Sequence, residues 1–120
     1  MSATTIKNNK RTFVAGEAID AYLVVVLGSS ESVTKAGGAS ASESVVGLTT
    51  SSVANADSTG ISLIKGGATA FATASKAIDA GEAVYTAASG KITDDSSTGT
   101  LVGLALEGAS ADGDVIEIAF

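Results

Sequence analysis

A chain of 120 residues can form one compact domain, or two half-domains around a shared core, but not a large internal active-site cavity. It contains no Cys and no His, which excludes disulfide bonds, zinc sites of the usual kinds and acid–base catalysis by histidine. The net charge is −6 and all 13 acidic residues follow residue 11, so the body of the protein is expected to repel nucleic acid.

Two further absences bear on location. No apolar run approaches the roughly 20 residues that a membrane span needs. The N-terminus also lacks the apolar stretch of a signal peptide, so we expect a protein that has no membrane partner and stays inside the producing cell.

The first eleven residues are polar and without periodicity, and they contain Lys7, Lys10 and Arg11 but no acid. Such a segment is either a solvated, flexible terminus or an arm that docks on a partner. Residues 12–14 suggest a first short strand. We assign residues 1–14 to an extended N-terminal arm.

The next part of the chain alternates β-branched segments with Gly- and Ser-rich connections, which is typical of short strands. Residues 20–27 are nearly all apolar and predict a strand that is covered on both faces. The other strands expected in this part are residues 32–35, 45–50, 61–64 and 68–75.

The closing part, residues 78–120, has a cleaner β-pattern, with strands expected at residues 82–86, 91–93, 100–107 and 115–120. It also matches the earlier part piece by piece. The matching segments are residues 19–21 with 78–80, 46–48 with 102–104, and 56–63 with 111–118. We therefore predict an all-β, compact, barrel-like domain over residues 15–120, built from tandem repeats at about 15–75 and 76–120.

Alternation along the expected strands predicts a core and an outer face. The side chains expected to point inward are Val25, Val46, Leu48, Ile61, Leu63, Val84, Val102, Leu104, Leu106, Ile116, Ile118 and Phe120. Ile64 and Leu101 are expected to point outward. Because covering these two would stabilise a protein with a thin core, we predict an oligomer in which they lie at the interface.

No set of residues predicts catalysis, a cofactor or a metal. The Gly90-Lys91 pair lacks the other residues of a phosphate-binding loop. The aspartates at residues 94–95 and 112–114 do not follow the ligand rhythm of a calcium loop, and turn chemistry explains them better. Residues 81–84 are similar to a step in biotinyl and lipoyl carrier domains, but the central Met-Lys pair of those domains is missing.

Four segments in the second repeat carry a family resemblance: AGEAVY at residues 80–85, SGKIT at 89–93, LVGLALE at 101–107 and ADGDVI at 111–116. In this order and spacing they resemble the C-terminal repeat of the small capsid decoration, or cement, proteins of tailed bacteriophages. The resemblance covers about residues 15–120. The first repeat departs from it at Tyr22-Leu23, where the second repeat has Gly81-Glu82.

This resemblance implies a trimer on the outer capsid surface of the virion, made in the host cytoplasm, that stabilises the shell by bridging subunits of the major capsid protein. It also implies an N-terminal arm that becomes ordered against the capsid. The capsid-contact residues expected on that basis are Thr4, Thr5, Ile6, Lys7, Lys10, Arg11 and Phe13.

Two other classes stay open at this point. One is a different structural module, such as a phage tail or baseplate β-domain or a self-assembling surface subunit. The other, more remote, is a carrier domain or an enzyme.

Overall fold

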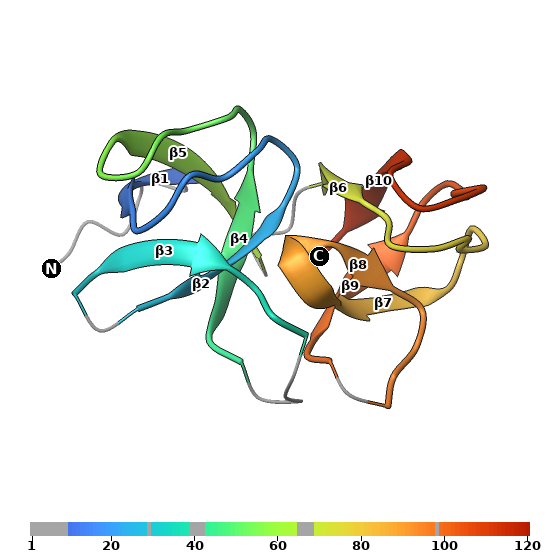
Figure 1. Ribbon diagram of the computed structural model, residues 1–120. Helices are drawn as coiled ribbons and strands as arrows, with labels where there is room; N and C mark the ends of the chain where they lie inside the picture. The colour runs from blue at the N-terminus through green and yellow to red at the C-terminus, as the bar shows by residue number, and fades with distance from the viewer. Residues whose placement is uncertain (1–9, 29, 39–42, 65–68, 98) are drawn as a thin grey trace, which may run out of the picture.

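The computed structural model describes residues 10–28, 30–38, 43–64, 69–97 and 99–120. Within them the chain forms two β-rich halves that lie side by side (Figure 1). The strands of the first half are β1 (Lys10–Ala15), β2 (Val24–Leu27), β3 (Ser32–Lys35), β4 (Val45–Thr49) and β5 (Ser58–Leu63). Those of the second are β6 (Thr69–Thr73), β7 (Ala83–Thr86), β8 (Ile92–Thr93), β9 (Leu101–Ala105) and β10 (Val115–Ala119), with a short 3-10 helix, η1 (Ala88–Gly90), before β8.

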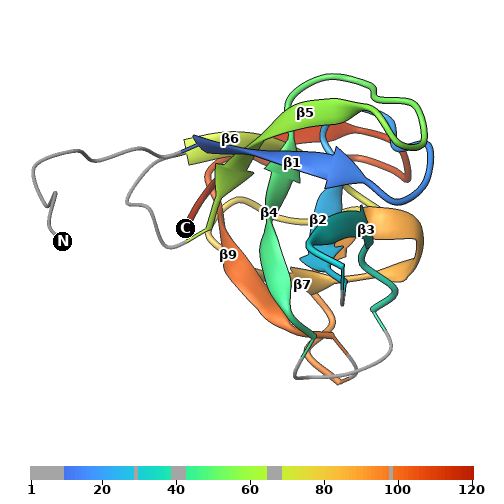
Figure 2. The same ribbon diagram turned by 90° about the vertical axis from the view of Figure 1, so that its left-hand side faces the viewer.

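The first half is a closed barrel with the strand order β1-β3-β2-β4-β5. It closes because β1 pairs antiparallel with β5 and parallel with β3; β1 and β5 are seen together in Figure 2. The second half is a five-stranded sheet with the order β6-β10-β9-β7-β8. Its two ends are joined by a single parallel bridge between Ala74 and Ile92. The all-β, barrel-like prediction is confirmed.

The two halves pair their strands in the same way. Val25 pairs with Gly47 in the first half, and Val84 pairs with Gly103 in the second. An isolated bridge between residues 19 and 53 likewise has its counterpart between residues 78 and 109. Strand pairing divides the chain between β5 and β6, ahead of the repeat boundary at residue 75 that the sequence suggested.

One part of the sequence matching is wrong. The sequence aligned Ile61 with Ile116, but Ile61 pairs with Thr49 as Ile118 pairs with Ala105, so Ile118 is the equivalent residue. The connection from β4 to β5 is a residue shorter than the one from β9 to β10. Because both connections are polar and turn-rich, the sequence pattern did not fix their relative length.

A bulge explains a second error, in the predicted core. The register of β7 on β9 shifts between Val84 and Tyr85, which leaves Val102 as an extra residue. A bulge inverts the alternation of side chains beyond it. Leu104 therefore lies on the outer face of the second half, where it is 43% exposed; Leu106 is similarly exposed, and Ala105 takes the inward place instead.

The rest of the predicted core is buried or packs against buried residues. One cluster fills the first barrel: Phe13, Ala15, Ile19, Leu23, Val25, Val33 and Ile61. The other fills the second half and continues into the first through Val24, Ala36 and Leu48. Of the strand predicted at residues 20–27, only Val24–Leu27 forms β2. Val25 is covered by its own barrel and Val24 by the second half, as predicted, but Leu27 is 42% exposed.

Candidate interaction surfaces

The basic residues nearest the N-terminus of the described chain lie on β1. Lys10 and Arg11 are exposed, and the Arg11 guanidinium lies 4.8 Å from the centre of the Phe13 ring. Phe13 itself is buried in the first barrel, so its side chain stabilises the fold and is not available to a partner. The other expected contact residues, Thr4, Thr5, Ile6 and Lys7, lie outside the described residues.

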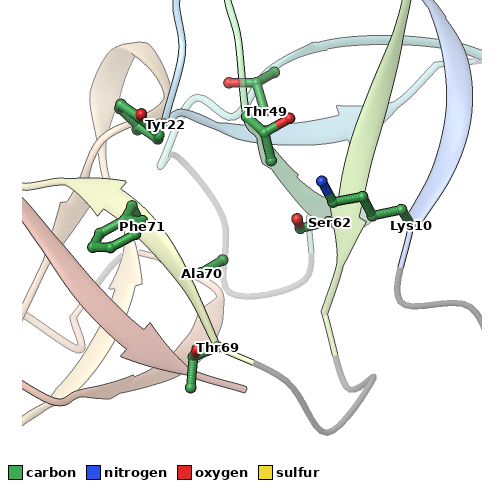
Figure 3. A pocket seen from close by; sticks show the side chains of 8 residues that line it. Lys10, Tyr22, Thr49, Ser62, Thr69, Ala70 and Phe71 are labelled. Atoms are coloured by element: carbon green, nitrogen blue, oxygen red, sulfur yellow. The ribbon is translucent and has the colours of Figure 1, made fainter.

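A cleft of about 330 Å³ opens between the two halves, close to Lys10. Figure 3 shows its lining residues, with Lys10 and Ser62 on one wall and Tyr22 and Phe71 on the other. The Tyr22 and Phe71 rings meet edge to face, with their centroids 6.0 Å apart. An ammonium group beside hydroxyls and two aromatic rings can receive an acidic side chain of a partner.

Tyr22 occupies this cleft in an unusual backbone conformation. Its φ is 65°, in the left-handed region where the equivalent residue of the second half is Gly81, with a φ of 91°. The Tyr22 carbonyl accepts hydrogen bonds from the Thr73 backbone N–H (2.9 Å) and hydroxyl (3.0 Å). These bonds across the halves hold a conformation that a tyrosine seldom adopts.

Glu43 joins the halves at a second place. Its carboxylate accepts hydrogen bonds from the backbone N–H groups of Gly37 (2.9 Å) and Gly38 (3.1 Å). The same carboxylate accepts a 2.6 Å bond from the hydroxyl of Thr86 in the second half, while the Glu43 N–H donates to the Thr100 hydroxyl (2.8 Å).

An apolar groove lies on the outer face of β9 and the end of β10. We call it the second-half patch, and its lining residues are Ala83, Leu101, Val102, Gly103, Leu104, Ala119 and Phe120. Leu101 is 57% exposed and remains available to a partner. Ile64, the other predicted interface residue, packs against the core cluster that spans the two halves.

The aspartates are occupied by turns and ion pairs. Asp112 pairs with Lys91 (2.7 Å) and Asp94 with Lys76 (3.3 Å). Asp114 accepts the backbone N–H of Ser110. Across the described residues, no three His, Cys, Asp or Glu side chains gather into a possible metal site.

The surroundings of Asp95 predict a lowered pKa for its carboxyl group. Hydrogen bonds from the backbone N–H and side chain of Ser97 stabilise the charged carboxylate and lower the pKa of Asp95 below its ordinary value of 3.8. A lowered folded pKa contributes stability above the ordinary pKa, and this contribution is lost as the pH falls through the folded value. NMR titration of the Asp95 carboxyl should give a midpoint below 3.8; a midpoint at or above 3.8 would contradict the assignment.

Comparison with known proteins identifies the family. A family model described as phage cement protein matches residues 5–120. The chain belongs to the phage cement proteins. No curated protein matches the sequence. Among solved structures, the N base of head fiber gp8.5 of bacteriophage phi29 is similar, with a TM-score of 0.67, 21% identity and 92% of each chain covered. At that identity the likeness concerns the fold.

Membership gives this cement protein a structural role in association with the phage capsid. The family resemblance inferred from residues 80–116 is confirmed. In the described residues, no helix is long and apolar enough to cross a membrane.

Sequence reasoning missed the cleft and part of the patch of this cement protein. Leu104 was assigned to the core because it alternates with Val102 and Leu106 along the expected strand, but of Leu104 and its repeat counterpart, Leu48, only Leu48 is buried. The mismatch of Tyr22 with Gly81 was the one sequence signal that the halves differ where the cleft lies.

Proposed function

We propose that this cement protein binds the outer face of a phage capsid as a trimer and stabilises the shell by bridging neighbouring subunits of the major capsid protein. The observation that carries the proposal is the family match over residues 5–120. The similarity of this protein to the N base of a phage head fiber also supports a position on the phage head. The role is structural and needs no catalysis or cofactor.

The proposed capsid contact is the basic N-terminal segment. Lys10 and Arg11 are exposed at the start of β1, and Lys7 precedes them in a segment with no acid, whereas the rest of the chain is acidic. Opposite charge steers an arm to an acidic capsid surface. A segment that precedes the first strand of a barrel, as residues 1–9 precede β1, can also add to a sheet edge through main-chain hydrogen bonds. Many copies on one shell would gain from avidity.

Deleting residues 1–9 is expected to abolish capsid binding and leave the fold intact. The deletion ends where β1 begins, so every strand pair described for the barrel is kept. Co-sedimentation with mature heads measures binding, and thermal unfolding by circular dichroism checks the fold. Undiminished binding by the folded deletion protein would overturn the role of the arm.

The charges of β1 can be tested in the full chain. Reversing both Lys10 and Arg11 to glutamate should weaken capsid binding at least tenfold and reduce its salt dependence. Lys76→Glu is the control, because Lys76 is an exposed lysine in the second half. Because the control reverses one charge and the double variant two, a loss of binding free energy in the control that is half as large would point to general charge instead of a defined contact.

A further inference from the structure

We infer that the second-half patch is covered by the first half of another copy of the chain, in a head-to-tail contact that repeats the packing between the two halves of one copy. The inference rests on the trimer proposed above and names the surfaces that would form it.

The first half has a face equivalent to the second-half patch, and that face is covered. Val24 pairs with Leu48 in β2 and β4, as Ala83 pairs with Leu104 in β7 and β9. Val24 and Leu48 are fully buried because they belong to the core cluster of the second half. The equivalent pair in the second half, Ala83 and Leu104, is exposed. Within a single chain, this face is therefore covered in the first half and exposed in the second half.

The covering surface comes from one edge of the second half. Thr73 in β6 donates to Tyr22, and the Gly90 N–H donates to the Ala36 carbonyl (2.8 Å). Thr86, at the end of β7, donates to Glu43. This edge therefore consists of the ends of β6 and β7 with η1.

The corresponding edge of the first half is bare. By strand pairing, Val14 corresponds to Thr73, because Val14 pairs with Ser58 as Thr73 pairs with Val115. Leu27 corresponds to Thr86, since these residues pair with Val33 and Ile92. We call the exposed residues Val14, Leu27 and Gly28 the first-half edge.

The first-half edge is apolar at two positions where the second half is polar, and the exposed Glu31 lies beside it at the place of Gly90. Val14 is 45% exposed and Leu27 is 42% exposed, at the positions where the second half uses the hydroxyls of Thr73 and Thr86. An apolar edge suits an apolar patch that contains Leu101 and Leu104. Exposed apolar groups that are contiguous mark association surfaces more often than isolated ones do.

The bare patch and the bare edge are different surfaces, so the contact between copies is heterologous. A heterologous contact either closes into a ring or continues as an open filament. Each copy would contribute two similar halves to such a ring. Going around the ring, a contact between two halves of one chain would be followed by the same kind of contact between two neighbouring chains. Three copies would close it in the proposed trimer.

Single substitutions in the patch test the inference on purified protein without capsids. Leu104→Asp, and separately Leu101→Asp, should raise the dissociation constant for self-association at least tenfold in analytical ultracentrifugation, because each puts a charge in an apolar contact. Both side chains are exposed, so folding should persist, as thermal unfolding will show. Val115→Asp is the matched control: Val115 is 42% exposed on β10, outside both surfaces, and should leave association unchanged.

Mixing distinguishes a head-to-tail contact from a symmetric one. Leu27→Asp alters the first-half edge and keeps the patch, whereas Leu104→Asp alters the patch and keeps the edge. Each variant alone should be monomeric, and an equimolar mixture should form a one-to-one dimer through the two surfaces left intact. A mixture that stays monomeric overturns the head-to-tail assignment.

Other results also overturn it. The wild-type protein could be monomeric alone while the patch variants lose capsid binding. That result would mean that a segment of the capsid, and not a second copy, covers the second-half patch. Patch variants that associate like wild type, or a control that dissociates equally, would remove the role of the patch. A trimer that dissociates as expected but ignores capsids would instead overturn the proposed function.

Discussion

Replacing Gly103 by alanine is expected to lower the free energy of unfolding by at least about 3 kcal/mol. A Cβ added at residue 103 would lie 2.1 Å from the carbonyl oxygen of Ala119. That oxygen belongs to the backbone of β10, next to β9, so the strands must separate to make room. Thermal and denaturant unfolding of the purified protein measure the change.

The first half offers a repeat of this experiment and a control. A Cβ at Gly47 would lie 1.9 Å from the carbonyl oxygen of Ser62, so Gly47→Ala should cost a similar amount. At Gly60, on β5, nothing lies within 4 Å, and alanine should be neutral or stabilising by up to about 1 kcal/mol. Equal stability of the Gly103→Ala and Gly60→Ala proteins would contradict the close approach of β9 and β10.

The recurrence of the Val-Gly-Leu triplet at residues 46–48 and 102–104 was visible in the sequence, and it aligned the two halves correctly there. The physical reason was not visible. Only the structure shows that both glycines face a neighbouring strand too closely for a side chain. Repetition in a sequence locates an equivalent position, whereas the contact that requires it comes from a distant strand.

The positions of most strands could be predicted from the sequence. The face of the sheet on which each side chain lies could be predicted only in part. Short β-branched segments between turn residues predicted most strands, because local propensity and alternation decide them. The outward direction of Leu104 was not predictable, since a bulge depends on how β7 and β9 pair across a long connection. The same limit applies to Val24 and Leu48, whose burial comes from the other half.

The candidate contact residues show a similar division. Lys10 and Arg11 are exposed, in keeping with the basic segment recognised from the sequence. Phe13 was grouped with them because it is close in sequence, but it occupies an inward position on β1. The start of β1 at Lys10 was not evident, because its partner strand, β5, lies almost fifty residues further along the chain.

Replacing Glu43 by alanine is expected to lower the free energy of unfolding by about 2–4 kcal/mol. The carboxylate accepts bonds from Gly37, Gly38 and the hydroxyl of Thr86, so its loss leaves several donors unpaired at once. Thr86 is buried, and an unpaired donor lowers stability most where water cannot reach it. Because the bonds cross from one half to the other, the substitution should also weaken the junction between the halves.

Hydrogen exchange and unfolding together check this second effect. Exchange of the amides of Gly38 and Gly90 should accelerate in Glu43→Ala, because Gly90 donates across the same junction to Ala36. Glu107→Ala is the control, since the Glu107 carboxylate accepts a single long bond of 3.3 Å at an exposed site and should cost less than about 0.5 kcal/mol. If Glu43→Ala were no less stable than Glu107→Ala, Glu43 would have no part in joining the halves, and apolar packing with the bonds to Tyr22 and Ala36 would hold them.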